Sequence, residues 1–142
     1  MTSRDPLAQR LALLGPFAGC SDAELAEVVR RTCSCRVHPG DRLAVEGAAG
    51  HEFVVIVEGH ADVSVAGELV ARLGPGDCFG EVALLDGGAR SATVTATTDM
   101  VLQVSDRREL QAVLASAPTV GQNLLRTLAS RLRAANRSGA QR

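Results

Sequence analysis

The chain has 142 residues, which is the size of one domain, and 46% of them are hydrophobic, so it can bury a core. The net charge is −1 and the only aromatic residues are three phenylalanines. This excludes a strong positive field for nucleic acid or anionic lipid, and the aromatic platforms of single-strand binders. Because no apolar run approaches ~20 residues and no signal peptide is evident, we expect a cytoplasmic protein without a membrane or nucleic-acid partner. Its basic residues are all arginine, which is typical of a high-GC bacterial genome.

Residues 5–31 carry helical signals. Asp5 can cap a first helix that has Pro6 at its first position. Ser21, with Glu24 three residues later, has the pattern of a capping box at the start of a second helix. We therefore expect two N-terminal helices, each with one apolar face.

Residues 32–105 read as strands. Alternating or β-branched runs recur at short intervals and are separated by turns rich in glycine, proline and aspartate. The runs lie at 33–37, 43–45, 53–57, 63–65, 69–73, 93–98 and 101–104. About eight short strands with turns this frequent predict a barrel, a sandwich or a roll.

Helical periodicity returns over residues 106–137, where Pro118 begins the longer of two helices. The residues just before Pro118 are the expected hinge. A stripe of leucines, Leu125, Leu128 and Leu132, can pack on the strands or against a second copy of the chain. It is too short for an independent coiled coil. We interpret the arginines of this region as a solvent-facing surface, since no helix-turn-helix follows them.

Four cysteines occur, at Cys20, Cys33, Cys35 and Cys78. Cys33 and Cys35 would share one strand face. They lack the C-x2-C pairs of zinc sites, so we expect buried thiols, with a redox role or metal ligation as the alternatives.

The three histidines, His38, His51 and His60, fall at predicted turns. A metal-dependent cupin enzyme is an alternative for a β-rich chain, but it needs an H-x-H pair, and none is present. A serine nucleophile in a G-x-S-x-G elbow is missing as well. The sequence therefore favours neither a metal site nor an enzyme.

One segment of helix-like composition interrupts the strands at residues 79–85. Backbone N–H groups at a helix N-terminus form an anion site, and Gly80 would allow a close approach. Arg90, on the strand that follows, can add a two-pronged contact to phosphate. A carboxylate at Glu81 would repel an anion unless it accepts hydrogen bonds from a hydroxyl such as that of a ribose. This combination favours a nucleotide whose phosphate and sugar lie close together, as in a cyclic phosphodiester.

The stretch FGEVALLDGGARSATV, residues 79–94, resembles the phosphate-binding cassette of the cyclic nucleotide-binding domain family. The family pattern is roughly F-G-E-[LIV]-[AG]-L, followed by R-[AST]-A-x-V. PGDRLAVEGAAGHEFVVIVEGHADV is similar to the first strands of that domain, and FAGCSDAELAEVV to its N-terminal helix. The resemblance covers residues 17–136. The family occurs in catabolite-activator-type regulators, regulatory subunits of cAMP-dependent kinase and nucleotide-gated channels.

The resemblance implies a mainly β fold, an eight-stranded jelly-roll-like β-roll, in one domain over residues 1–142. N-terminal helices, a short cassette helix and C-terminal lid helices would flank the roll. Glu81, helped by Gly80, would bind the ribose 2′-hydroxyl. The amides of Val82 and Ala83, with the guanidinium of Arg90, would hold the cyclic phosphate.

The resemblance specifies the base of the nucleotide less well than its phosphate and ribose. In this family a hydroxyl at the position of Ser91 can contact phosphate or read guanine, so we expect cAMP, with cGMP as the alternative. Asn136 is the candidate for covering the base. The ligand is the only small molecule implied, with no cofactor and no metal.

The expected function is that of a stand-alone sensor that signals by closure of its C-terminal helix and acts on a protein effector in trans. The alternative is a degenerate domain that keeps the fold only as a protein-interaction module. Glu81 and Arg90 would then be a structural ion pair that ties a loop to a strand.

Overall fold

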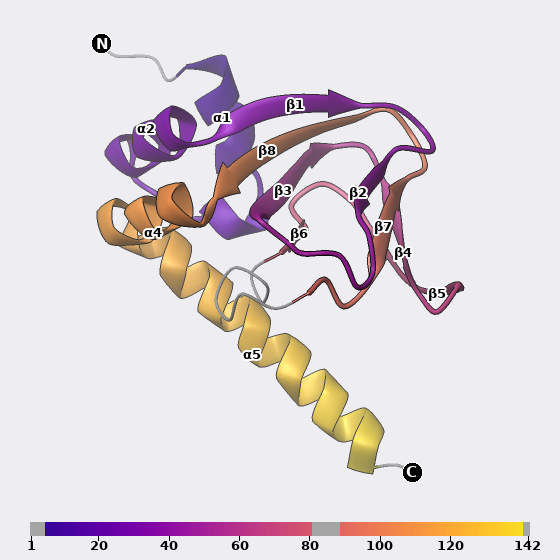
Figure 1. Cartoon of the computed structure of the whole chain (residues 1–142). Coiled ribbons are helices and arrows are strands. Elements are labelled where there is room, and N and C mark those ends of the chain that lie inside the picture. Colours follow the sequence, from indigo (N-terminus) through magenta and orange to yellow (C-terminus); the bar gives the residue numbers. More distant parts are fainter. Residues whose placement is uncertain (1–4, 81–88, 141–142) are drawn as a thin grey trace.

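The structure is a computed structural model that describes residues 5–80 and 89–140 (Figure 1). Two antiparallel four-stranded sheets, ordered β1-β8-β3-β6 and β2-β7-β4-β5, face one another in this part of the chain. The strands are β1 (Cys33–Val37), β2 (Arg42–Ala44), β3 (Glu52–Glu58), β4 (Ala61–Val65), β5 (Glu68–Leu73), β6 (Cys78–Phe79), β7 (Thr93–Ala96) and β8 (Met100–Asp106). The predicted jelly-roll-like β-roll is confirmed.

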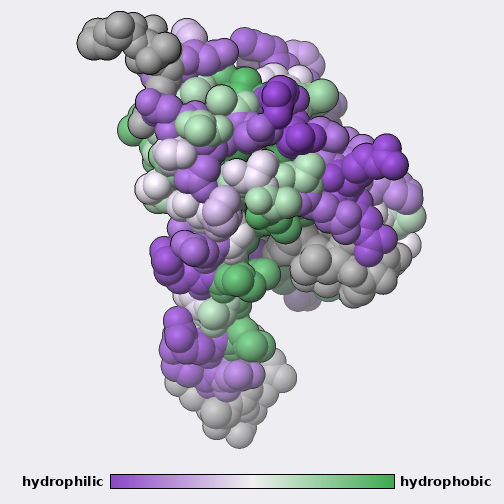
Figure 2. Space-filling model, turned by 90° about the vertical axis from the view of Figure 1, so that its left-hand side faces the viewer, coloured by the Kyte–Doolittle hydropathy of each residue, from purple (hydrophilic) through white to green (hydrophobic). Residues whose placement is uncertain are grey.

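Helices from both ends of the chain pack together on one side of the roll (Figure 1). They are α1 (Pro6–Ala12), the 3-10 helix η1 (Gly15–Phe17), α2 (Asp22–Arg31), α4 (Arg107–Ser116) and α5 (Pro118–Ala140). Figure 2 shows that α5 projects well beyond the body of the protein. No helix of the described residues has both the length and the apolar character needed to cross a membrane.

The predicted helix starts are confirmed. The carboxylate of Asp5 accepts a hydrogen bond from the backbone N–H of Leu7 (2.8 Å). The side chains of Ser21 and Glu24 each accept from the other's backbone N–H (3.1 and 3.0 Å), which completes the capping box of α2. The break before Pro118 is also present, since α4 ends at Ser116 and α5 begins at Pro118.

The local pattern did not predict β6. Cys78 and Phe79 pair with Val55 and Val54 of β3, so a long-range ladder makes a strand of residues at the start of the expected helical insert. Residues 81–88, which include the expected cassette helix, lie outside the described residues.

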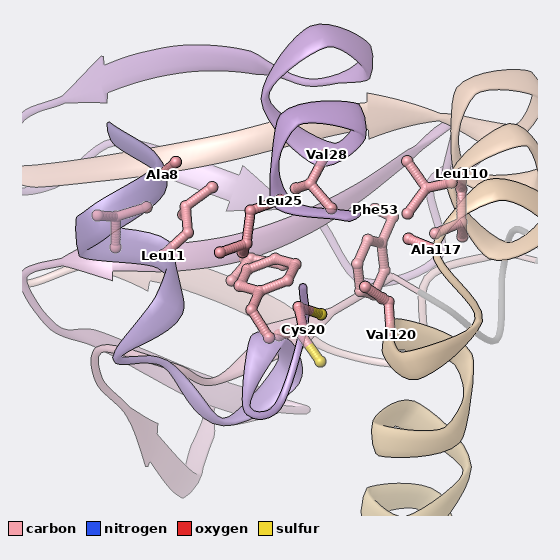
Figure 3. Close-up of a cluster of buried hydrophobic side chains, with 14 of the residues drawn as sticks. Ala8, Leu11, Cys20, Leu25, Val28, Phe53, Leu110, Ala117 and Val120 are labelled. Carbon is pink, nitrogen blue, oxygen red and sulfur yellow. The ribbon is translucent and has the colours of Figure 1, made fainter. Parts of the chain in front are cut away.

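The central strands β3 and β8 supply two separate cores. On β3, Phe53, Val55 and Val57 face the helices, whereas Val54 and Ile56 face the interior of the roll. This is the alternation of a strand that is covered on both faces. Figure 3 shows the helix-side core, to which β3 contributes Phe53, α2 contributes Leu25, α4 contributes Leu110 and α5 contributes Val120.

The expectation that all four thiols are buried is half wrong. Cys20 and Cys78 are buried, but Cys33 and Cys35 are exposed. Both exposed thiols lie on β1, which is an edge strand and has exposed side chains at its first four positions. The pattern of alternating residues predicted the strand correctly, but it could not show that Cys33 and Cys35 are exposed.

Candidate functional site

A cavity of about 330 Å³ opens between the two sheets at the end of the roll where the cassette begins. Small and apolar side chains from the roll form its floor, namely Ala44, Val63, Ala71, Leu73 and Val94. Polar groups at its mouth come from Gly80, Arg90, Ser91 and Arg131. The cavity therefore has an apolar interior and one cationic edge, which suits a small ligand with a flat apolar part and an anionic part.

Arg90 is fixed by its backbone. Its N–H donates to the carbonyl oxygen of Ala48 (2.8 Å), and its own carbonyl oxygen accepts from the N–H of Gly47 (2.9 Å). The neighbouring Ala89 forms an isolated bridge with Ala49. The turn that follows β2 thus holds the segment that carries Arg90, which lies just before β7 and not on a strand as predicted.

The side chain of Arg90 is fixed as well. Nη2 donates to the carbonyl oxygen of Glu52 at 2.7 Å, which holds the half-buried guanidinium at the edge of the cavity. A guanidinium has five N–H donors, so the others can serve an anionic ligand. Arg90 is therefore positioned before any ligand arrives, which lowers the entropic cost of binding.

Gly80 makes room for this arginine. Its φ is +99°, a conformation that favours glycine. A Cβ at this position would lie 2.3 Å from the carbonyl oxygen of Glu52 and 2.6 Å from Nη1 of Arg90. The sequence predicted a glycine for close approach to a ligand. The structure adds that the guanidinium of Arg90 itself packs directly on this glycine.

The structure brings together three of the predicted site residues. Gly80, Arg90 and Ser91 all line the cavity. Glu81, Val82 and Ala83 lie outside the described residues, so their roles remain predictions.

Asn136 is not brought to the cavity. It is exposed on α5 and is not among the residues that line the cavity in the described part of the chain. Its role in covering the base stays a prediction.

Arg131 is a site residue that the sequence analysis missed. From α5 its Nη2 donates to the carbonyl oxygen of Cys78 on β6 (3.3 Å), and the side chain lines the cavity. Helical spacing could have indicated that Arg131 lies on the same face of α5 as Thr127 and Leu128. It follows these two partly buried residues by four and three positions. The long helix therefore reaches the cavity, but one turn earlier than expected.

The first half of α5 is anchored to the N-terminal helices. The carboxylate of Glu24 accepts hydrogen bonds from the backbone N–H of Thr119 (2.9 Å) and from its hydroxyl (3.0 Å). Backbone hydrogen bonds from Ser21 and then from Thr119 hold the pKa of Glu24 below its usual range. The buried amide of Asn123 donates to the carbonyl oxygens of Pro16 (3.0 Å) and Ala18 (2.9 Å).

The described residues offer no metal site of three or more ligands from histidine, cysteine, aspartate and glutamate. His38, His51 and His60 are exposed, as predicted for turn residues.

The cavity volume of about 330 Å³ lies at the lower end of the ~300–1,000 Å³ range of small-molecule pockets, so the cavity suits a ligand the size of a mononucleotide.

The fold is a β-roll with a cavity that suits a small anionic ligand. A sequence profile of the cyclic nucleotide-binding domain matches residues 34–117, which is more than half of the chain. The chain belongs to this family, and it is a cyclic nucleotide-binding domain.

Similar proteins are regulators and sensors. A CRP-like cAMP-activated global transcriptional regulator of Mycobacterium tuberculosis is 29% identical over an alignment of 131 residues that covers 89% of this chain and 58% of that protein. The crystal structure of the Thermus thermophilus catabolite activator protein superposes with a TM-score of 0.80 at 29% identity, over 87% of this chain and 61% of that one.

A structure of a cAMP-binding acyltransferase from Mycobacterium smegmatis also matches. It is 30% identical with a TM-score of 0.75, over 89% of this chain and 41% of that one. The chain thus spans about three fifths or less of the length of the relatives described here.

Proposed function

We propose that this chain is a receptor for cAMP that signals through α5 and has no enzymatic activity of its own. The observation that carries the proposal is the cavity with Arg90 fixed at its mouth and packed on Gly80. We further propose that the protein works in the cytoplasm.

Arg90 would hold the cyclic phosphate. A guanidinium forms charge-assisted, bidentate hydrogen bonds with phosphate oxygens, and these are about twice as strong as neutral ones. Glu81 would accept from the ribose 2′-hydroxyl, and the amides of Val82 and Ala83 would donate to the phosphate. Ser91 lies next to Arg90 at the cavity and can donate to the phosphate from the same side.

The base would lie over the apolar floor. Val63, Leu73 and Val94 offer aliphatic contacts that suit any purine, and they carry no group that distinguishes adenine from guanine. Preference for cAMP over cGMP therefore depends on Ser91 and on what α5 brings to the base. A ligand of about 22 heavy atoms at ~0.3 kcal/mol per atom gives roughly −7 kcal/mol, or tens of micromolar, which charge-assisted contacts improve.

The signal would pass from the cavity to α5 through Arg131. This side chain contacts the Cys78 carbonyl oxygen and also lines the cavity, so a ligand that engages it favours one position of the helix over another. A ligand shifts such an equilibrium only by its difference in affinity for the two positions. The break between α4 and α5 at Ala117 is the proposed hinge, and a protein effector in trans would read the change.

A second copy of the chain is the proposed partner of the projecting half of α5. Leu125 and Leu132 are 69% and 63% exposed, and together with Leu128 they have the spacing of a coiled-coil seam. The stripe need not form an independent coiled coil, because α5 is already anchored to the domain at Asn123. In a parallel pair with these leucines at a and d, Arg131 takes a g position and faces Asn136 of the second copy at e. That arrangement would bring Asn136 close to the cavity.

The test is a calorimetric titration of the protein with cAMP, cGMP and 5′-AMP side by side. We expect cAMP to bind with micromolar affinity or better, and 5′-AMP to bind much more weakly because its open phosphate has a different charge and shape. If none of the three binds, the proposal is wrong and the chain is an interaction module that keeps only the fold.

The expectation that nucleic acid is not a partner stays a prediction.

A further inference from the structure

Two exposed thiols lie on the edge strand β1. Cys33 and Cys35 are exposed, whereas Cys20 and Cys78 are buried. The exposed pair is separated by Ser34, so the two cysteines lie on the same face of the strand. Neither lines the nucleotide cavity.

The opposite face of β1 is tied down. The hydroxyl of Ser34 hydrogen bonds to the side chain of Gln103 on β8, and the amide of Gln103 donates to the hydroxyl of Thr32 (2.7 Å). All five residues of β1 pair in register with β8. These contacts fix the backbone that carries the two thiols, so the spacing of Cys33 and Cys35 is set by strand geometry.

That spacing excludes a disulfide between them. Residues two apart on a strand have Cα atoms about 6.6 Å apart, and their side chains are nearly parallel, so the Cβ atoms are about equally distant. A disulfide needs Cβ atoms about 3.5–4.5 Å apart. Cys33 and Cys35 therefore cannot join without breaking the pairing of β1.

The same spacing suits a bridging ion. Strand side chains lean along the strand in either direction, so opposite rotamers of Cys33 and Cys35 bring the sulfurs together. Two metal–thiolate bonds of about 2.3 Å can span up to about 4.6 Å when they are nearly collinear. The pair can thus chelate an ion, although it cannot oxidise to an internal disulfide.

We propose that Cys33 and Cys35 form a two-thiolate site for a soft monovalent cation, Cu⁺. Thiolates suit Cu⁺, Zn²⁺ and iron–sulfur clusters, and of these Cu⁺ is stable with only two, nearly collinear, sulfur ligands. Zn²⁺ prefers four ligands, and no group of three or more metal-binding side chains occurs in the described chain. On binding, each thiol loses its proton to solvent as its S–Cu bond forms, and no electron is transferred.

The site is tested by anaerobic titration of the reduced protein with Cu⁺ against a chromogenic Cu⁺ chelator, with native mass spectrometry. We expect one Cu⁺ per chain in the wild type. Cys33→Ser and Cys35→Ser should each abolish this binding, because one thiolate cannot chelate. Ser34→Ala is the matched control, since it lies between the two thiols but keeps both.

Phenylarsine oxide provides a second readout of whether the two thiols can act together. It condenses with two thiols, forming two As–S bonds and releasing one water, so the wild type should carry one arsenical that resists a monothiol wash. Burial and the nearby Glu24 charge raise the pKa of Cys20 to about 11, so this thiol should not compete. One-to-one Cu⁺ binding or stable arsenical capture by either single variant would overturn the proposal. cAMP titration of the same variants should match the wild type, so the receptor function is tested separately.

Discussion

The two faces of the central strands β3 and β8 have different surroundings. On the helix side, Phe53 and Val55 belong to a buried cluster that also contains large helix side chains such as Leu25 (Figure 3). On the roll side, Val54 and Ile56 are equally buried, but the core that they form with Ala44 and Val94 adjoins the cavity of about 330 Å³, which Ala44 and Val94 line.

The side chains explain the difference. The helices supply leucines and one phenylalanine, Phe17, to one face, whereas the second sheet supplies residues as small as Ala44 and Ala71 to the cavity on the other side. Protein interiors are normally close-packed, so a hollow lined by small residues beside a fixed arginine indicates a place for a ligand. The helix side of these strands therefore stabilises the fold, whereas the core on their roll side also borders the candidate binding cavity.

The largest expected effect is on stability, at the helix-side core. Leu11→Ala should lower the free energy of unfolding by about 3–4 kcal/mol, because Leu11 is fully buried and its loss leaves a cavity. Leu13→Ala is the matched control two residues later, where the side chain is 87% exposed, and it should change stability by less than ~0.5 kcal/mol. Urea denaturation measures both. Equal effects of the two variants would contradict the assignment of the core.

A second variant probes the binding face. Gly80→Ala should weaken cAMP binding at least ~10-fold and cost about 1–2 kcal/mol of stability, since its φ is +99° and its Cβ would strike Arg90. Gly67→Ala has comparable strain at φ +82°, but no atom lies within 4 Å of the added Cβ. It should therefore lose stability and keep its affinity. Loss of binding in both variants would show that strain, and not the contact with Arg90, sets the affinity.

A smaller effect concerns the joint between α2 and α5, and it depends on pH. The pKa of Glu24 is lowered by hydrogen bonds from Ser21 and Thr119, so its charge stabilises the fold above the ordinary glutamate range, and this stabilisation is lost as the pH falls through the lowered pKa. Glu24→Gln should be less stable than the wild type by less than ~1 kcal/mol at pH 7, with the gap closing below about pH 4. Urea denaturation at several pH values between 3 and 7 measures the difference in unfolding free energy between the two proteins. A difference that stays constant over this range would show that the charge of Glu24 has no role.

The smallest effect on stability is expected at the projecting half of α5. Exchange of Leu125 and Leu132 for serine should change the unfolding free energy of the single chain by less than ~0.5 kcal/mol, because both side chains are exposed. The same exchange should abolish self-association in sedimentation velocity runs. If the wild type stays a monomer at high concentration, the proposed second copy is wrong.

Much of the fold follows from local signals. Asp5, the Ser21–Glu24 pair and Pro118 mark helix starts that the structure confirms, because capping depends on neighbouring residues. The strand β6 and the exposure of Cys33 could not be predicted in this way, since both depend on which distant segment lies alongside.

The site was predictable in part. Gly80 and Arg90 were found because their residue types suit an anion, and both line the cavity. Arg131 was missed because its place depends on the angle at which α5 passes the roll, which no local pattern contains. The contact between Gly80 and Arg90 is likewise a consequence of tertiary packing.

Calorimetry of cAMP with the Arg90→Ala variant tests most directly whether this arginine holds the phosphate. We expect a loss of about 2–3 kcal/mol, or roughly 30- to 150-fold in affinity, with an unchanged urea midpoint. Arg72→Ala, which removes an exposed arginine paired with Asp62 away from the cavity lining, should bind like the wild type. Near wild-type affinity of Arg90→Ala would contradict the account.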